Sequence, residues 1–213
     1  MGAKSRDWSD NPKMKTEIKL WSDFYAKLGQ VDLDCPSNDE VIRGTMGSSE
    51  FRDRADAIIQ LFGAFRSILE IGCGYGGMVL EILELKKVSY TVVDNEAMLN
   101  QAQRFLGNAV KYVDARDIGR TLRDKKFDLF ISHHCLSETP RKYRDYILVN
   151  IIKNCKKISV MDINDNKNPT RRMVRAGYEI DNLNIEKSIR KYFKIIKIRT
   201  GRSQSMYIGK RLK

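Results

Sequence analysis

Apolar and polar residues follow two alternating patterns along most of the chain. Between residues 51 and 163, short apolar runs alternate with longer segments whose apolar positions recur at helical spacing. A short apolar run is typical of a buried strand, and a period near 3.6 residues is typical of an amphipathic helix. Strands that alternate with helices predict βαβ units, with a parallel sheet between two layers of helices.

The pattern assigns a residue range to each element. The predicted strands cover residues 67–72, 89–94, 109–114, 127–132 and 158–163, and the predicted helices cover residues 51–65, 76–87, 96–107, 118–126 and 140–157. Residues 191–200 and 205–211 are predicted to form an antiparallel hairpin that closes the sheet. The predicted fold class is therefore α/β: a Rossmann-like, doubly wound, mostly parallel seven-stranded sheet with an antiparallel C-terminal hairpin.

A helical segment precedes this region. Residues 13–28 place five apolar side chains at helical spacing, namely Ile18, Trp21, Phe24, Tyr25 and Leu28. A turn-rich stretch follows, so residues 1–50 are predicted as an N-terminal helical extension or lid, and residues 51–213 as the main domain. Two interpretations of the aromatic residues stay open: a lid that stacks on a sugar ring, or a packed core.

Composition excludes several classes of protein. A hydrophobic fraction of 42% is enough for a core, and no apolar run approaches the roughly 20 residues of a membrane helix. The first residues contain no apolar signal-peptide core, so we expect a cytoplasmic location. The four cysteines are far apart and form no C-x-x-C pair, so we expect neither a zinc site nor a disulfide framework.

The net charge of +12 is the unusual feature of the composition. A basic surface attracts polyanions such as RNA, phosphorylated sugars or acidic lipids. Much of the excess is scattered over predicted helix faces and the last 25 residues, which favours a solvated surface over a dedicated nucleic-acid site. The expected partner is therefore a small molecule or a glycan; nucleic acid stays open as a partner, as does the oligomeric state.

A glycine-rich loop is the most informative motif. The stretch ILEIGCGYGG places Gly72, Gly74 and Gly76 where a buried strand ends and a helix begins. A tight turn at this point needs glycine, because the backbone takes unusual φ angles and lies close to a ligand. With Gly77 the loop also satisfies the dinucleotide fingerprint G-x-G-x-x-G, which is weak on its own.

Two acidic residues narrow the choice of cofactor. Asp94 ends the second strand, where a carboxylate can bind both ribose hydroxyls of an adenosine-containing cofactor. Glu70 lies two residues before Gly72. A carboxylate at that point would repel a bound pyrophosphate but would attract a cationic cofactor.

The glycine loop and the acids after it resemble the motifs of a known enzyme family. LEIGCGYGG, with VVD closing the next strand, resembles the first two motifs of class I S-adenosylmethionine-dependent methyltransferases. The resemblance implies that the glycine loop approaches the amino-acid part of S-adenosylmethionine, that Asp94 binds its ribose and that Asp114 contacts its adenine amino group. Asp114 as a cap for the next helix, and Cys73 as a small loop residue, stay open as alternatives. The predicted cofactor-binding residues are Glu70, Gly72, Cys73, Gly74, Gly76, Asp94, Asn95, Asp114, Ala115 and Ser132; no metal ligand is predicted.

The predicted catalytic residues follow the fourth strand, in the loop SHHCLSETP. Ligands of open α/β sheets bind beyond the carboxyl ends of the strands, and histidine is the commonest general base. His134 is preferred over His133 as the proton acceptor, and Glu138 is predicted to orient the imidazole or to bind the substrate. In the alternative interpretation the histidines pack at the edge of the sheet.

A closer resemblance covers about residues 60–165. The Gly-Tyr-Gly-Gly loop, the helix rich in Leu and Gln after Asp94 and the pair Ser137-Glu138 are similar to sugar O-methyltransferases associated with surface polysaccharide synthesis. Cys73, Asn95 and Glu96 depart from that pattern. The resemblance implies O-methylation of a sugar or of another small-molecule hydroxyl. An RNA methyltransferase that uses the basic surface and a non-catalytic partner subunit are the alternatives.

Overall fold

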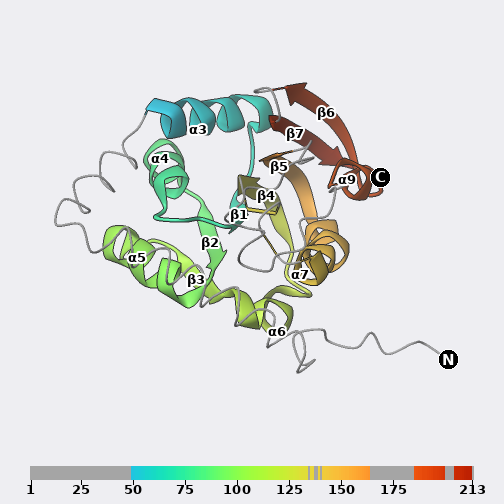
Figure 1. The fold of residues 1–213 in the computed structure, drawn as a ribbon. Helices are drawn as coiled ribbons and strands as arrows, with labels where there is room; N and C mark the ends of the chain where they lie inside the picture. The colour runs from blue at the N-terminus through green and yellow to red at the C-terminus, as the bar shows by residue number, and fades with distance from the viewer. Residues whose placement is uncertain are drawn as a thin grey trace.

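One mixed sheet forms the centre of the protein. The computed structural model describes residues 49–133, 135–136, 139, 141–163, 185–199 and 204–212. Within these residues, seven strands are arranged in the order β3-β2-β1-β4-β5-β7-β6 (Figure 1). The strands β1 to β5 run parallel, and β7 is antiparallel to both β5 and β6. The predicted α/β fold and its C-terminal hairpin are confirmed.

The elements lie close to their predicted positions. The strands are β1 Ser67–Ile71, β2 Ser89–Asp94, β3 Lys111–Asp114, β4 Phe127–His133, β5 Cys155–Ile163, β6 Phe193–Arg199 and β7 Gln204–Arg211. The helices are α3 Ser49–Phe62, α4 Gly77–Leu85, α5 Glu96–Leu106, α6 Ile118–Leu122, α7 Arg141–Tyr146 and α9 Ile185–Arg190. Three short segments, η2 Ala115–Asp117, η3 Ile147–Ile151 and η4 Ile152–Asn154, lie next to α6 and α7.

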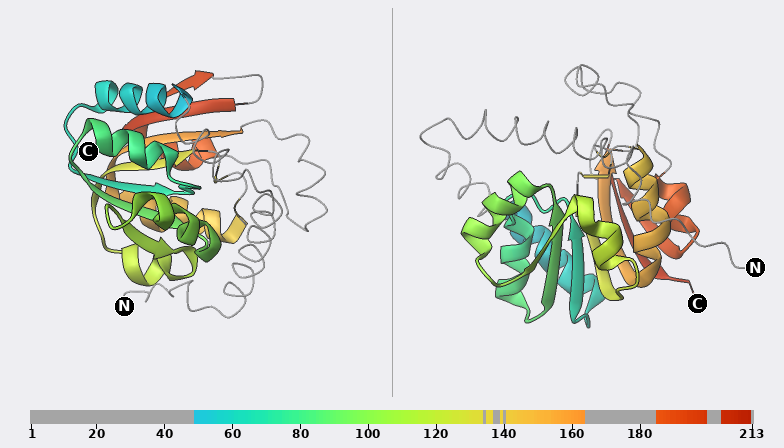
Figure 2. Two further views of the ribbon diagram at one scale, coloured as in Figure 1. Left: turned by 90° about the vertical axis from the view of Figure 1, so that its left-hand side faces the viewer. Right: turned by 90° about the horizontal axis from the view of Figure 1, so that it is seen from below.

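Helices cover both faces of the sheet (Figure 2). Neighbouring residues of a strand point to opposite faces, so Ile68 packs in the layer of α3, α4 and α5, whereas Leu69 packs in the layer of α6, α7 and α9. Both side chains are fully buried. Burial on two faces explains why the strands read as continuous apolar runs rather than as an alternation.

Two boundaries differ from the prediction. The helix predicted over 140–157 ends at Asn154, and residues 155–157 belong to β5 instead. Cys155 is fully buried and pairs with Phe127 of β4, while the Nζ atom of Lys157 donates to the carbonyl oxygen of Phe62 at 2.8 Å. Pairing with β4 therefore overrides the helical propensity of this stretch. The helix α6 is shorter than predicted, and α9 was not predicted.

The first predicted segment cannot be compared with the structure. Residues 1–48 lie outside the described residues, so the division into 1–50 and 51–213 and the two interpretations of the aromatic residues stay predictions. Among the helices that are described, none combines the length and the apolar character that a membrane span requires.

One carboxylate ties together the beginnings of β1, β4 and β5. Oδ2 of Asp128 accepts hydrogen bonds from the backbone amides of Arg66 at 2.8 Å and Ser67 at 3.3 Å. Oδ1 accepts from Nζ of Lys156 at 2.7 Å. The hydrogen bond from Lys156 is the main reason why the pKa of Asp128 lies below its ordinary value. The ionised form is therefore favoured in the folded protein.

We expect Asp128→Asn to lower the free energy of unfolding by about 1–2 kcal/mol at pH 7, because the neutral amide loses the charge-assisted bonds. The folded pKa lies below the unfolded value of about 3.9, so the stabilisation is present above about pH 4 and is lost as the pH falls through the folded pKa. Urea denaturation at pH 7 and pH 3 measures the difference. Asp124→Asn, at an exposed turn residue, is the control, and an equal loss at both pH values would contradict the assignment.

Candidate functional site

The predicted cofactor residues meet at the carboxyl ends of three strands. In the register of the sheet, Asp94 of β2 pairs with Asp114 of β3, and Glu70 of β1 pairs with Val92 of β2. The glycine loop follows β1 directly, and the amide of Gly72 donates to the carbonyl oxygen of Val93 at 2.8 Å. The fold therefore brings the glycine loop and all three predicted acids to one edge of the sheet.

Gly72 and Gly74 are glycines for different structural reasons. Both take positive φ angles, 80° at Gly72 and 53° at Gly74, which strongly favours glycine. A Cβ atom added to Gly72 would collide with the side chain of Cys135, so this position is set by packing inside the protein. A Cβ atom added to Gly74 would meet no atom of the described residues within 4 Å. Within the described part of the chain, Gly74 thus borders space in which a ligand can come close to the backbone.

Asp94 links β2 to this loop. Its Oδ2 accepts a hydrogen bond from the Gly74 amide at 3.1 Å, and its Oδ1 accepts from the amide of Asn95 at 2.8 Å and from Nδ2 of Asn95 at 3.3 Å. A carboxylate has about four acceptor positions, so one is left for a ligand hydroxyl. Binding of both ribose hydroxyls, as predicted, requires that one of the present donors turns away. Burial raises the pKa of Asp94 to about 6, against the effect of the backbone hydrogen bonds from Asn95 and Gly74.

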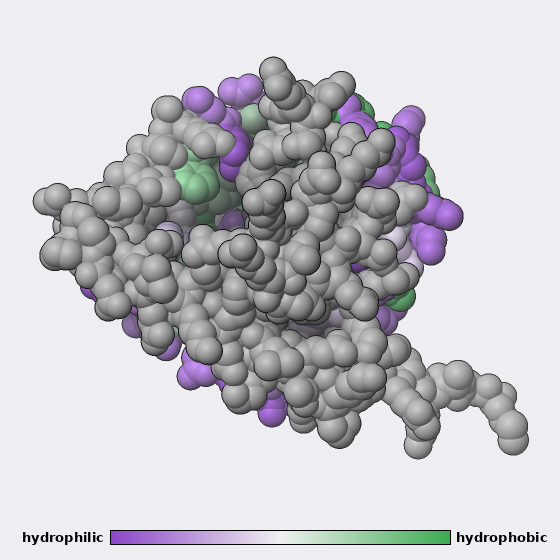
Figure 3. Space-filling model, in the orientation of Figure 1, coloured by the Kyte–Doolittle hydropathy of each residue, from purple (hydrophilic) through white to green (hydrophobic). Residues whose placement is uncertain are grey.

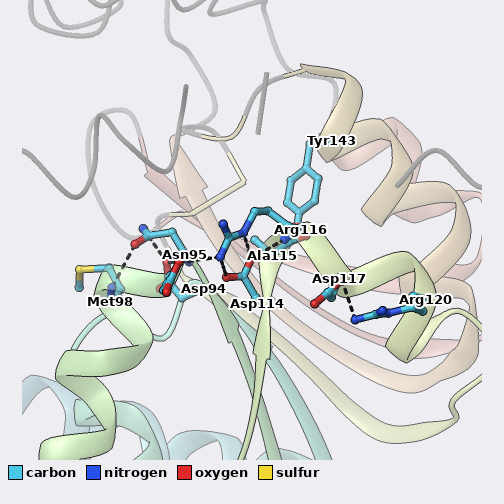
Figure 4. Close-up of polar contacts among 10 residues, drawn as sticks. Asp94, Asn95, Met98, Asp114, Ala115, Arg116, Asp117, Arg120 and Tyr143 are labelled. Carbon is cyan, nitrogen blue, oxygen red and sulfur yellow. Dashed lines mark hydrogen bonds and ion pairs between the residues drawn. The ribbon is translucent and has the colours of Figure 1, made fainter. Parts of the chain in front are cut away.

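Asn95 supports Asp94 and begins the next helix. It is the N-cap of α5, and its Oδ1 accepts from the amide of Met98 at 3.0 Å (Figure 4). Its side chain is buried, with 1% exposed. Sequence analysis placed Asn95 among the cofactor ligands; the structure gives it a role in orienting the Asp94 carboxylate, and direct contact with a cofactor stays a prediction.

Glu70 and Cys73 lie beneath the same edge. Glu70 is 3% exposed and its Oε2 accepts from the hydroxyl of Tyr90 at 2.6 Å. Burial raises the pKa of Glu70 to about 7; the hydrogen bond from Tyr90 lowers it, and the charge of Asp94 raises it further. Burial also raises the pKa of the Cys73 thiol well above its ordinary value. Cys73 packs among buried residues, and contacts of Glu70 and Cys73 with a cofactor stay predictions.

Asp114 is held by an arginine that sequence analysis did not select. Its Oδ1 accepts from the amide and from Nε of Arg116, both at 2.8 Å, and its Oδ2 accepts from Nη2 of Arg116 at 2.6 Å (Figure 4). Nη2 also donates to Oε2 of Glu96 at 2.7 Å. The bond to the Arg116 amide makes Asp114 the cap of η2, as its alternative interpretation predicted. The feature of the sequence that could have indicated a role for Arg116 is its position two residues after Asp114.

Ala115 and Ser132 occupy buried positions near these acids. The carbonyl oxygen of Ala115 accepts from the hydroxyl of Tyr143 at 3.0 Å, which joins α7 to the turn after β3. Ser132 of β4 is fully buried, and its Oγ has no hydrogen-bond partner within the described part of the chain. A buried hydroxyl without a partner costs free energy unless a ligand or water satisfies it. Contacts of Ala115 and Ser132 with a cofactor stay predictions.

The end of β4 carries the described part of the predicted catalytic loop. Nε2 of His133 lies 3.1 Å from Oγ of Ser159, which is fully buried in β5. This contact holds the imidazole against the neighbouring strand, and a catalytic role of His133 stays a prediction. His134 and Glu138 lie outside the described residues, so their roles stay predictions. No group of three or more residues suited to hold a metal ion occurs among the residues described.

Comparison with known proteins shows a similarity to one family over the part of the chain that builds this site. Residues 68–157 match the methyltransferase domain family. This range begins in β1 and ends in β5, so it includes the glycine loop, Asp94 and Asp114. The match covers less than half of the chain; it makes this part similar to a methyltransferase domain and indicates S-adenosylmethionine as its cofactor. No curated protein matches the chain in sequence.

Solved structures with the same fold share little sequence with the chain. The PH0226 protein from Pyrococcus horikoshii OT3 is 14% identical, with a TM-score of 0.58; the alignment covers 78% of this chain and 93% of that one. An O-methyltransferase family protein from Burkholderia thailandensis is 14% identical, with a TM-score of 0.57, and 78% and 60% of the two chains are covered. For the N-terminal domain of EvdMO1 in the presence of SAH and D-fucose, the identity is 14%, the TM-score is 0.56, and the coverage is 78% and 84%.

The site fits the indicated cofactor. The open space beside Gly74 admits a group close to the loop, and Asp94 and Asp114 each keep an acceptor position. The unpartnered hydroxyl of Ser132 lies in the neighbouring strand. A cofactor with a sulfonium and an ammonium group also complements the acids at this edge.

Gly74 and Gly107 form a matched pair that separates ligand binding from backbone strain. Their φ angles are 53° and 54°, and at both a Cβ atom would meet nothing within 4 Å. Gly107 caps the far end of α5. We expect both alanine variants to lose about 1 kcal/mol of stability or more, because each forces an L-residue to a positive φ angle; the loss should be larger at Gly107, whose ψ of −129° lies outside the left-handed helical region. Only Gly74→Ala should weaken cofactor binding in calorimetry, and equal affinities of the two variants would contradict the assignment.

Cofactor binding should depend on pH through the buried acids. The pKa values of Asp94 and Glu70 are raised to about 6 and about 7, so both carboxylates become protonated as the pH falls from 8 to 5. A protonated Asp94 accepts fewer hydrogen bonds and no longer attracts a cation. We expect the affinity for S-adenosylmethionine to fall about tenfold between pH 7.5 and pH 5, and Asp94→Asn to flatten the profile. A flat profile in the unaltered protein would contradict this.

Proposed function

We propose that the protein is an S-adenosylmethionine-dependent O-methyltransferase that acts on a sugar or on another small-molecule hydroxyl. One observation carries the methyltransferase part: the region that matches the methyltransferase domain family contains the open glycine loop and the paired acids of β2 and β3. The choice of a hydroxyl acceptor is a further step with its own support.

Three observations support a hydroxyl acceptor. Structures with the same fold include the mitomycin 7-O-methyltransferase MmcR, and EvdMO1 was solved in the presence of SAH and D-fucose. The sequence resembles sugar O-methyltransferases around the glycine loop and at Ser137-Glu138. The chain also lacks an N-P-P-Y or D-P-P-Y run after the fourth strand, which is the place where methyltransferases of base amino groups resemble one another.

The chain's own residues perform the binding and the proton transfer. When bound, S-adenosylmethionine would supply an electrophilic methyl group for attack by an in-line nucleophile, with the carbon–sulfur bond breaking and S-adenosylhomocysteine as the leaving group. Gly74 and Asp94 hold the cofactor, and a hydroxyl nucleophile then needs a base for its proton. Because the imidazole of His133 is hydrogen-bonded to the buried Ser159, we assign the base to His134, with Glu138 orienting it.

We expect His134→Ala to lower turnover by roughly 10²–10⁴-fold and to leave cofactor affinity almost unchanged, because a general base acts in the transition state. His133→Ala is the matched control on the adjacent residue. It should lower the thermal midpoint through loss of the contact with Ser159, with near-normal turnover per folded molecule. Steady-state kinetics and thermal unfolding of both variants measure these effects. Full activity of a well-folded His134→Ala variant would contradict the assignment.

Mass spectrometry of products from a panel of nucleotide sugars, glycans and small phenols tests the acceptor class. A mass increase of one methyl group on a sugar confirms the proposal. RNA is the competing acceptor, because the net charge is +12. Figure 3 shows hydrophilic side chains on the side of the molecule where β6 and α9 lie. There Glu186 forms ion pairs with both Arg190 and Lys197, so these two positive charges are partly neutralised within the protein. Detection of methylated RNA, together with an affinity of the protein for RNA that falls steeply as the salt concentration rises, would identify RNA as the acceptor instead of a sugar.

A further inference from the structure

We propose that Arg116 is a positioning residue of the cofactor site, which fixes the Asp114 carboxylate so that the site prefers an adenine amino group to a carbonyl at the same position. This inference rests on the proposed function, because it concerns the adenosine end of the cofactor. It adds a residue for which neither the sequence motifs nor the family match gave a role.

The first step is the number of acceptor positions on Asp114. Three donors of Arg116 occupy both positions of Oδ1 and one position of Oδ2, at 2.8, 2.8 and 2.6 Å. A carboxylate has about four positions, so one is left on Oδ2. Because Nε and Nη2 bind side by side, the carboxylate cannot rotate without breaking both bonds. The remaining acceptor therefore has a fixed direction.

The second step is the connection to the neighbouring loop. Nη2 of Arg116 also binds Glu96, the first residue of α5, which follows β2 and Asn95. One guanidinium thus joins the turn after β3 to the first residue of α5, and these two segments flank the predicted adenosine position. The planar fork of arginine makes this three-way contact, which the single ammonium of a lysine cannot reproduce.

The third step is the charge. Asp94 and Asp114 are paired in register, and the charge of Asp114 raises the pKa of Asp94. The guanidinium of Arg116 contacts both Asp114 and Glu96, so a positive charge lies between the two acids. A carboxylate accepts a hydrogen bond from an amino group but has no proton to donate to a carbonyl oxygen. The fixed direction of the remaining acceptor on Asp114 therefore favours adenine over a 6-oxo base.

Calorimetry with S-adenosylhomocysteine and with S-inosylhomocysteine, which has a carbonyl in place of the amino group, tests the inference. We expect the unaltered protein to bind S-adenosylhomocysteine at least about tenfold more tightly, as for a hydrogen bond to a charged group. Arg116→Ala should weaken S-adenosylhomocysteine about tenfold and S-inosylhomocysteine less than about twofold. A purely structural role would weaken both ligands equally and would overturn the inference.

Two further variants complete the test. Arg120→Ala is the matched control, because Arg120 pairs with the exposed Asp117 at 3.0 Å in the adjacent helix and should leave both affinities unchanged. Arg116→Lys should recover only part of the preference, and full recovery would overturn the role of the fork. If the unaltered protein binds neither ligand, the proposed function fails together with the inference. If it binds and discriminates while Arg116→Ala behaves identically, only the role of Arg116 fails.

Discussion

The hydrogen bond from the Gly74 amide to the Asp94 carboxylate joins the two loops that build the candidate site. It exists because β1 and β2 are adjacent and parallel, so that their carboxyl ends open at the same edge of the sheet. Gly74 takes a positive φ angle, and among the described residues no atom lies within 4 Å of the place where its Cβ atom would be. The position of a cofactor therefore depends on backbone geometry first and on side chains second.

Placing several acids at this edge of the sheet costs electrostatic free energy, and nearby hydrogen-bond donors offset part of that cost. Glu70 and Asp94 are both buried, and burial raises both pKa values. Tyr90 donates to Glu70, and backbone amides donate to Asp94. Arg116 balances Asp114 from the third strand. The result is a group of acids whose charge is only partly neutralised, which is the environment that a cationic cofactor complements.

The sequence predicted the fold well, because the order of strands and helices depends on local patterns. Apolar runs and glycine spacing place β1, the loop and Asp94 without knowledge of tertiary contacts. Contacts distant in sequence were not predictable in the same way. Residues 155–157 read as helix because only their pairing with β4 makes them a strand. The bridge from Arg116 to Glu96 spans 20 residues and needs the β2–β3 register to be seen.

The amino and carboxyl ends of the parallel strands differ in how completely their polar groups are paired. At the end where β1 and β4 begin, Asp128 and Lys157 bind backbone groups of the segment that follows α3, so strand positions are fixed by polar contacts distant in sequence. At the carboxyl end, donors and acceptors are only partly paired: Ser132 has no partner among the described residues, and Asp94 and Asp114 keep acceptor positions. A protein tolerates unpaired buried polar groups where a ligand satisfies them. Polar contacts thus fix the strands where they begin, whereas at the carboxyl end of the described strands the remaining acceptor positions and the Ser132 hydroxyl are suited to contact a cofactor.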